Sequence, residues 1–170
     1  MKNIVLIGFM GCGKSTFGKK ISKKLNYQFV DTDKWIEKQQ GQTISSIFAT
    51  QGEAAFRQME TEAAQTLSKE EGLVLSTGGG MVKTPKTMEA LCQNAIVVYL
   101  KATPEHIFQN IGHDTTRPLL QTDDKLGAIR RLMEEREDLY QRYATVTVTV
   151  SGHSITGTTN AILHQLEGLL

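Results

Sequence analysis

The chain has little cysteine, little net charge and no long apolar run. Only Cys12 and Cys92 occur among 170 residues, so a disulfide framework is not expected, and a reducing cytoplasm fits best. A net charge of +1 argues against a nucleic-acid-binding surface. The longest apolar runs have the length of strands, and the N-terminus leads directly into one. We therefore expect neither a transmembrane span nor a signal peptide.

Repeats and low-complexity tracts are also absent, and the length sets a further limit. A chain of 170 residues is long enough for a real core but too short for a second domain, so a single domain over 1–170 is predicted. The hydrophobic content of 39% and the charged content of 22% are typical of an ordinary globular protein.

What the sequence does contain is a phosphate-binding loop. Residues Gly8–Ser15 fit the pattern G-x-x-x-x-G-K-[S/T], which binds the phosphates of ATP or GTP. The apolar run 4–7 before the loop predicts a buried strand, and Phe17, Ile21 and Leu25 after it repeat at helical spacing. A strand, this loop and a helix are the setting that the motif requires.

The chemistry of such a loop follows from its geometry. Glycines let backbone N–H groups approach the phosphates, and the N-terminus of the helix adds positive potential. Lys14 is predicted to reach the β- and γ-phosphates, and the hydroxyl of Ser15 to bind Mg²⁺ directly.

Apolar patterns along the rest of the chain predict alternating strands and helices. Strands are expected at 3–7, 28–30, 73–76, 95–100 and 145–150. Helices are expected at 14–25, 33–40, 44–51, 53–69, 85–93, 104–111, 125–143 and 157–168. This alternation indicates a three-layer α/β fold on a parallel sheet. The stretch 112–124 has no periodicity, and we expect it to form a mobile lid.

In parallel sheets ligands gather beyond the carboxyl ends of the strands, and two aspartates follow the second strand. Asp31 and Asp33 point the same way if the chain there is extended. Asp31 is the candidate to contact Mg²⁺ through water. Asp33 is the candidate to bind acceptor hydroxyls and to take a proton from one of them. The alternative for Asp33 is a helix N-cap.

The third strand ends in the glycine run Gly78–Gly80. Three glycines cost backbone entropy, so either a close approach of the backbone or a left-handed turn is expected there. Either arrangement lets N–H groups face a substrate.

Arg136 lies on the inward face of its predicted helix. It shares a stripe with Ile129, Met133, Tyr140 and Tyr143. A charge on that face must be paired or bind an anion. Because no acidic residue shares the stripe, an anionic ligand is favoured over an internal ion pair.

Two further arginines are candidates. Arg57 stands three residues before Glu60, which could hold its guanidinium for bidentate binding of a carboxylate. The alternative is a surface salt bridge. Arg117 lies in the predicted lid, from which it could stabilise charge on a transferred phosphoryl group. The sequence Pro118-Leu119-Leu120 after it indicates a segment that docks onto something.

Together these residues predict a kinase for a small hydroxylated acid, and the chain resembles the shikimate kinase family along nearly its whole length. The motifs that carry the resemblance are Gly8–Thr16, Asp31-Thr32-Asp33, Phe56-Arg57 with Glu60, Ser76–Gly80, Arg117–Leu120 and Arg136 within Glu135–Tyr140.

The resemblance implies a nucleoside-monophosphate-kinase-like fold with a five-stranded sheet in the order 2-3-1-4-5. It implies transfer of the ATP γ-phosphate to the 3-hydroxyl of shikimate, on the route to chorismate and the aromatic amino acids. ATP and shikimate are then the partners and Mg²⁺ the cofactor, in a cytoplasmic protein that we expect to be a monomer without nucleic-acid or membrane partners.

The resemblance also implies a role for individual residues. Nucleotide binding falls to Gly11, Cys12, Gly13, Lys14, Ser15, Thr16 and Arg117. Shikimate binding falls to Asp33, Arg57, Gly78, Gly79, Gly80 and Arg136, with Phe48 and Phe56 lining the pocket. Lys14, Asp33 and Arg117 are the implied catalytic residues, with Ser15 and Asp31 around Mg²⁺.

One position departs from the family. Where its members usually carry an arginine that stacks on adenine, seven residues before the lid arginine, this chain has Asn110. Adenine is then expected to be held differently, by neighbours of Arg117 or by the loop Ser151–Ser154.

Two other functions remain open at this point. The first is another small-molecule kinase on the same fold, acting on a nucleoside monophosphate or on gluconate. The second is a nucleotide switch that binds partners, although the N-K-x-D guanine motif of GTPases does not occur in the sequence.

Overall fold

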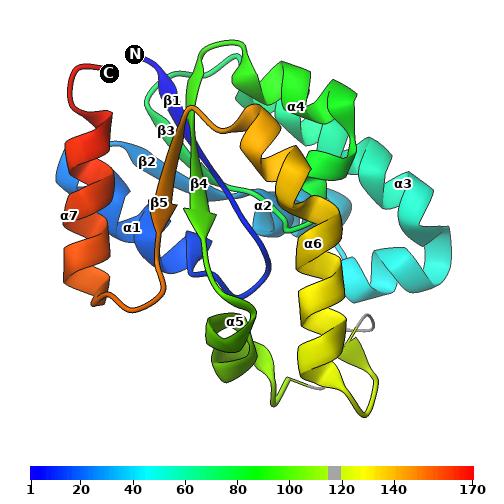
Figure 1. Ribbon diagram of the computed structural model, residues 1–170. Coiled ribbons are helices and arrows are strands. Elements are labelled where there is room, and N and C mark those ends of the chain that lie inside the picture. The colour runs from blue at the N-terminus through cyan, green and yellow to red at the C-terminus, as the bar shows by residue number, and fades with distance from the viewer. Residues whose placement is uncertain (115–119) are drawn as a thin grey trace.

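The computed structural model describes residues 1–114 and 120–170, and it contains a parallel sheet with helices on both faces (Figure 1). The sheet has five strands in the order β2-β3-β1-β4-β5, as predicted. The strands are β1 (Asn3–Ile7), β2 (Gln28–Asp31), β3 (Leu73–Ser76), β4 (Ala95–Lys101) and β5 (Val146–Thr149).

The helices also lie close to their predicted positions. They are α1 (Lys14–Leu25), α2 (Thr32–Gln40), α3 (Ile44–Leu67), α4 (Pro85–Cys92), α5 (Pro104–Ile111), α6 (Lys125–Tyr143) and α7 (Ile155–Leu166), with a 3₁₀ turn at Met81–Lys83. Two predicted helices run together as α3, but Gly52 inside it is non-helical, with φ 85° and ψ 173°, so the expected break is present as a kink.

Each face of the sheet packs against its own helices because the side chains of a strand alternate. From β1, Ile4 and Leu6 join a core cluster that includes residues of α1 and α7. Val5 and Ile7 join a second cluster that includes residues of α3 and α4. All four side chains are fully buried, which is why β1 reads as a continuous apolar run.

The predicted lid is only partly described. Arg117 lies outside the described residues, so its predicted role stays a prediction. Leu120, the last residue of the segment expected to dock, is fully buried and belongs to the core cluster on the α1 side.

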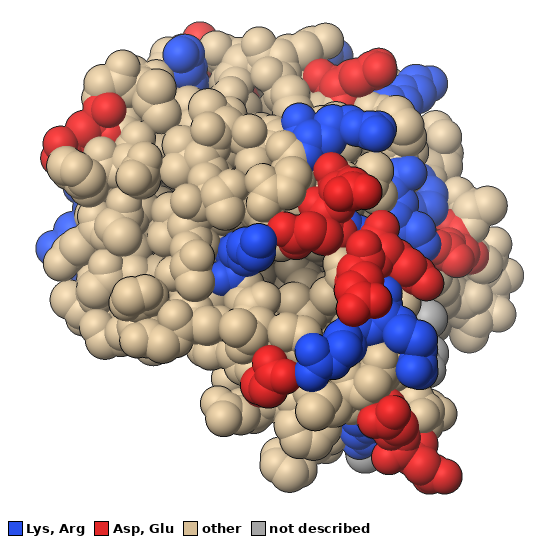
Figure 2. Space-filling view, in the orientation of Figure 1, with Lys and Arg blue, Asp and Glu red and all other residues tan. Residues whose placement is uncertain are grey.

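The exposed charges are mixed in sign. Figure 2 shows basic and acidic side chains interleaved over the part of the surface formed by α6 and its neighbours. Pairs such as Lys101–Glu137 and Arg130–Glu105, at 3.1 and 2.7 Å, account for part of this pattern. No helix in the described part of the chain is long and apolar enough to cross a membrane.

Candidate active site

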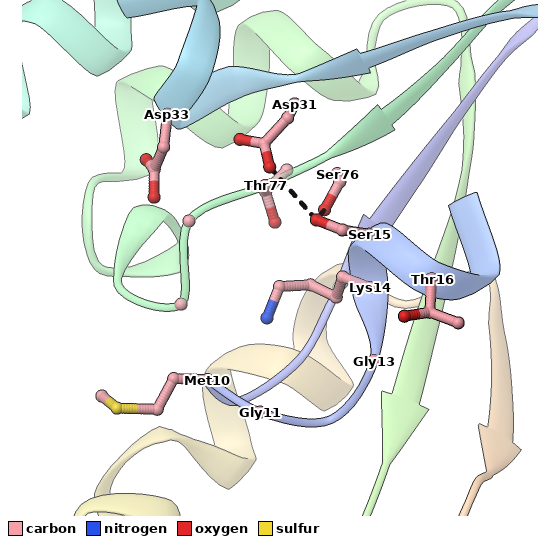
Figure 3. A pocket seen from close by; sticks show the side chains of 12 residues that line it. Met10, Gly11, Gly13, Lys14, Ser15, Thr16, Asp31, Asp33, Ser76 and Thr77 are labelled. Carbon is pink, nitrogen blue, oxygen red and sulfur yellow. Dashed lines mark hydrogen bonds between the residues drawn. The ribbon is translucent and has the colours of Figure 1, made fainter. Parts of the chain in front are cut away.

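Many of the predicted site residues in the described part of the chain meet at the carboxyl ends of β1, β2 and β3. The register pairs Ser76 of β3 with Leu6 of β1 and with Asp31 of β2. A cavity of about 270 Å³ opens beyond these ends (Figure 3). It is lined by Met10, Gly11, Gly13, Lys14, Ser15, Thr16, Asp31, Asp33, Ser76, Thr77, Gly78 and Gly79.

The phosphate-binding loop forms one wall of the cavity. Lys14 is 8% exposed, and its ammonium donates to the carbonyls of Gly8 and Phe9, at 2.7 and 3.0 Å. Gly13 precedes α1 with φ 100°, a conformation that favours glycine, and an added Cβ would lie 2.8 Å from the Phe17 ring. Cys12 faces away from solvent and is almost fully buried. The loop thus presents Lys14 and the N-terminus of α1 to the cavity.

Three oxygen-bearing side chains meet beside the loop. The Ser15 hydroxyl donates to the Asp31 carboxylate at 3.1 Å and lies 3.3 Å from the Ser76 hydroxyl. Hydroxyl and carboxylate oxygens are the ligands that Mg²⁺ prefers, so this donor set fits the predicted ion.

The geometry assumed for the aspartate pair is wrong in one respect. Asp33 lies in the first turn of α2 and not in extended chain, because the helix begins at Thr32. The N-cap of α2 is Asp31, whose carboxylate accepts from the backbone N–H of Lys34 at 3.2 Å. The capping role considered for Asp33 therefore belongs to Asp31, and both side chains still line the cavity (Figure 3).

Asp33 has the environment of a proton acceptor. Its Oδ1 is buried and has no hydrogen-bond partner in the described residues 1–114 and 120–170. Burial, and secondly the nearby Asp31 carboxylate, raises the pKa of Asp33 above its usual range. A carboxylate with a raised pKa is a better base toward a hydroxyl.

The three consecutive glycines, here called the glycine segment (Gly78–Gly80), approach four functional side chains. An added Cβ at Gly78 would lie 2.9 Å from Asp33 Oδ1 and 3.2 Å from Glu60 Oε2. One at Gly80 would lie 2.7 Å from Arg57 Nη2, and one at Gly79 3.6 Å from Arg136 Nη1. None of the three has positive φ, so the close approach predicted for this run is confirmed and the left-handed turn is wrong.

Arg57 is held by two glutamates of its own helix. Its guanidinium contacts Glu60 at 2.6 Å and Glu53 at 3.3 Å. The Glu60 side chain is only 1% exposed, so the surface salt bridge considered for Arg57 describes the Glu53 contact alone. The Glu60 contact supports the other hypothesis, in which Glu60 holds the guanidinium in place for bidentate binding of a carboxylate.

Arg136 is buried, as its place in the apolar stripe predicted. It is 5% exposed, donates to the Gly79 carbonyl at 3.2 Å, and lies with its guanidinium carbon 5.5 Å from the centre of the Phe9 ring. No ion pair of Arg136 occurs within the described ranges 1–114 and 120–170. A buried guanidinium of this kind is suited to an anionic ligand.

Neither of the two predicted pocket phenylalanines lines the cavity, and neither do Arg57, Gly80 or Arg136. The rings of Phe48 and Phe56 are 5.0 Å apart, and Arg57 stands 5.5 Å from the Phe56 ring. Phe56 is buried, whereas Phe48 is 40% exposed. Their predicted contact with the acceptor stays a prediction.

The structure adds residues that sequence reasoning did not assign to the site. Met10, Ser76 and Thr77 line the cavity. Thr77 donates to the Leu6 carbonyl through its hydroxyl at 2.8 Å, which ties the glycine segment to β1. Ser76 and Thr77 could have been assigned to the site from the sequence, because they stand between a strand end and three glycines. Met10 occupies a variable position of the loop motif, so the sequence gives no indication of its place in the site.

Asn110, the position that departs from the family pattern, contacts the phosphate-binding loop. Its side-chain amide donates to the Gly11 carbonyl at 2.8 Å. The neighbouring Ile111 also packs there, since a Cβ on Gly11 would lie 2.7 Å from it. The end of α5 thus contacts the phosphate-binding loop at Gly11.

Comparison with known proteins decides the family. The family model described as "Shikimate kinase" matches residues 10–167. The chain belongs to the shikimate kinase family. It is therefore a small-molecule kinase. A shikimate kinase of Caldanaerobacter subterraneus subsp. tengcongensis is 45% identical over 91% of this chain and 90% of its own.

Solved structures agree with this membership. The shikimate kinase from Acinetobacter baumannii in complex with shikimate has a TM-score of 0.91 and 36% identity, covering 98% of this chain and 93% of its own. A gluconokinase from Sinorhizobium meliloti has a TM-score of 0.63 at 18% identity, which shows a shared fold alone. Shikimate kinase family membership also removes the nucleotide switch that the loop by itself left open.

Proposed function

We propose that the protein transfers the γ-phosphate of ATP to the 3-hydroxyl of shikimate, giving shikimate 3-phosphate and ADP in the route to the aromatic amino acids. The observation that carries the proposal is the glycine segment, beside which Asp33, Arg57 and Arg136 gather and whose Gly78 and Gly79 line the same cavity as Lys14 and the phosphate-binding loop. Phosphoryl transfer depends mainly on such positioning and on charge stabilisation.

The residues divide the work as follows. Arg57 and Arg136 bind the shikimate carboxylate, and Asp33 accepts the proton of the 3-hydroxyl as its oxygen bonds to the γ-phosphorus and the bond to ADP breaks. Lys14 leaves its loop carbonyls for the phosphates. Arg117 is proposed to stabilise the transferred group.

The oxygen cluster of Ser15, Asp31 and Ser76 supports a role for Mg²⁺. Ser15 would bind the ion directly and Asp31 through water, and the ion would neutralise charge on the β- and γ-phosphates. We further propose a cytoplasmic monomer. The exposed large apolar side chains of the described residues come from scattered segments, namely Met1, Phe48, Phe108, Ile155, Leu169 and Leu170.

The test is a coupled assay of ADP release from ATP. The assay is run with shikimate, AMP or gluconate as the acceptor, and without an acceptor. We expect turnover with shikimate alone, and we expect Asp33→Asn to lower kcat by about 10²–10⁴. The matched control is Asp138→Asn, because Asp138 is an exposed carboxylate on α6. Turnover with AMP or gluconate but not with shikimate would overturn the proposal.

A further inference from the structure

One carbonyl of the glycine segment accepts two hydrogen bonds from the same helix. Gly79 accepts from the Tyr140 hydroxyl at 2.8 Å and from Arg136 at 3.2 Å. The two donors are four residues apart on α6, which places their side chains on one face. The shorter of the two bonds comes from Tyr140.

The Tyr140 ring is fixed in the core. It is 2% exposed and stacks on Tyr99 with ring centres 5.0 Å apart and an interplanar angle of 24°. The Tyr99 hydroxyl in turn donates to Glu137, which pairs with Lys101. Tyr140 therefore reaches Gly79 from a ring that neighbours on β4 and α6 hold in place.

The Tyr140 hydroxyl can act only as a donor toward this carbonyl. Burial raises the pKa of Tyr140 to about 12, with Arg136 opposing the effect, so the hydroxyl carries its proton at neutral pH. A carbonyl oxygen accepts and cannot donate. The bond thus fixes where the Gly79 oxygen points.

Arg136 depends on that oxygen for its orientation. Arg136 donates to the Gly79 carbonyl at 3.2 Å, the Phe9 ring supports the guanidinium by packing, and the adjacent Tyr140 hydroxyl is close enough for Arg136 to act on its pKa through a hydrogen bond. A guanidinium presents its N–H groups in a fixed plane, so anchoring one of them determines where the others point. A displaced carbonyl would therefore change the direction in which the remaining donors point.

We infer that Tyr140 is a positioning residue for recognition of the acceptor's carboxylate. Through the Gly79 carbonyl it aims Arg136, and it does not itself touch the substrate. The inference rests on the proposed function, in which Arg136 binds that carboxylate. If the hydroxyl served the core alone, its loss would lower stability and leave acceptor recognition unchanged.

The first test is Tyr140→Phe, which removes one oxygen and keeps the stacked ring. We expect KM for shikimate to rise about fivefold, as for the loss of one hydrogen bond, with kcat and KM for ATP within about twofold of wild type. Tyr143→Phe is the matched control, because it makes the same change one turn later on α6. The thermal midpoint of each variant shows whether the fold is intact.

The second test is a double-mutant cycle with Arg136→Ala. If Tyr140 acts through Arg136, adding Tyr140→Phe to Arg136→Ala leaves KM for shikimate unchanged. If Tyr140→Phe still raised KM for shikimate fivefold in the Arg136→Ala variant, the inference would be overturned. It would also be overturned if Tyr140→Phe alone raised KM for shikimate and KM for ATP equally. If Arg136→Ala raises KM for shikimate and Tyr140→Phe does not, the inference fails and the proposed function stands. If Arg136→Ala leaves KM for shikimate unaltered, the inference and the carboxylate role of Arg136 fail, whereas the proposed reaction fails only if shikimate is not phosphorylated.

Discussion

At the scale of single residues, the buried carboxyl of Glu60 is the most perturbed acid near the site. Its Oε1 contacts Arg57, whereas its buried Oε2 has no partner in the described ranges 1–114 and 120–170. Burial raises the pKa of Glu60 from 4.5 to about 7, although Arg57 acts in the opposite direction. Glu60 therefore changes its charge near neutral pH, beneath the arginine that is proposed to bind the acceptor.

This shift predicts a pH-dependent stability. Because the pKa is raised on folding, the contribution of Glu60 to the free energy of unfolding is full below pH 4.5 and is lost as pH rises through 7. The wild-type protein should lose about 1 kcal/mol of stability from this group between about pH 6 and about pH 8. Glu60→Gln should flatten the curve over that interval, as measured by urea unfolding at several pH values.

Glu53→Gln is the matched control for this experiment. Glu53 contacts the same arginine from the same helix, but its side chain is 55% exposed, and Lys83 and then Arg57 lower its pKa. Its protonation change lies in the acid range, so the slope between about pH 6 and about pH 8 should match wild type. An unchanged slope in Glu60→Gln would contradict the assignment.

The placement of a site residue was predictable where a local pattern includes it. The position of Lys14 and Ser15 at the cavity follows from a motif, and the burial of Arg136 follows from its helical stripe. The Gly79 carbonyl that orients Arg136 was not predictable. It comes from a segment 57 residues away in the sequence, and no local sequence pattern indicates that the two residues are in contact.

At the scale of elements, α5 and the phosphate-binding loop form one unit. Asn110 and Ile111 at the end of α5 both contact Gly11, and the backbone N–H of Thr103, the N-cap of α5, donates to the Ser151 hydroxyl at 2.9 Å. The loop after β5 is thus connected to α5, which in turn supports the loop that binds phosphates.

The α5 contact predicts an effect on nucleotide binding. Asn110→Ala removes the hydrogen bond to the Gly11 carbonyl, so KM for ATP should rise about fivefold, while KM for shikimate should stay within twofold of wild type by initial-rate kinetics. Gln109→Ala, the same truncation at the exposed neighbouring residue, should leave both values unchanged. A rise in KM for shikimate alone would contradict the role of α5.

Elements were largely predictable because their signals are local. Apolar runs and helical spacing placed every strand and helix within about three residues, and Gly52 marked the kink in α3. The start of α2 was also placed within one residue, but its geometry was not predicted. Asp31 ends β2 and caps the helix at once, so no extended residue separates the two elements and the assumed strand geometry of Asp33 was wrong.

At the scale of the whole molecule, the site joins segments from both halves of the chain. The phosphate-binding loop and Asp33 come from the first quarter of the sequence, whereas Arg136 comes from α6, in the last quarter of the sequence. A ligand that contacts all of them links these segments in the folded state only. Binding should therefore stabilise the entire protein.

Thermal unfolding measures this linkage. Shikimate at a hundredfold excess over its dissociation constant should add about 2.7 kcal/mol, which corresponds to a rise in Tm of about 5–10 °C for a domain of this size. Gluconate at the same concentration should leave Tm unchanged. The absence of any rise with shikimate, at concentrations that saturate turnover, would contradict the assembly of the site from these segments.

The sheet order required a resemblance, because the spacing of strands does not say which of them are neighbours. Local patterns predicted a parallel sheet, and the order β2-β3-β1-β4-β5 came from the shikimate kinase family. Contacts between distant segments are set by the packing of the whole chain, so local sequence patterns do not predict them.

The glycine segment has a consequence for how this enzyme can evolve. Its three residues leave room for Asp33, Arg57 and Arg136, and the smallest side chain at Gly80 would already collide with Arg57. Any missense change at that codon inserts a side chain into the contact. Because the contacted atoms are the end of a flexible side chain, a substitution at Gly80 would displace the Arg57 guanidinium, so we expect changes at this codon to alter acceptor binding before they alter the fold.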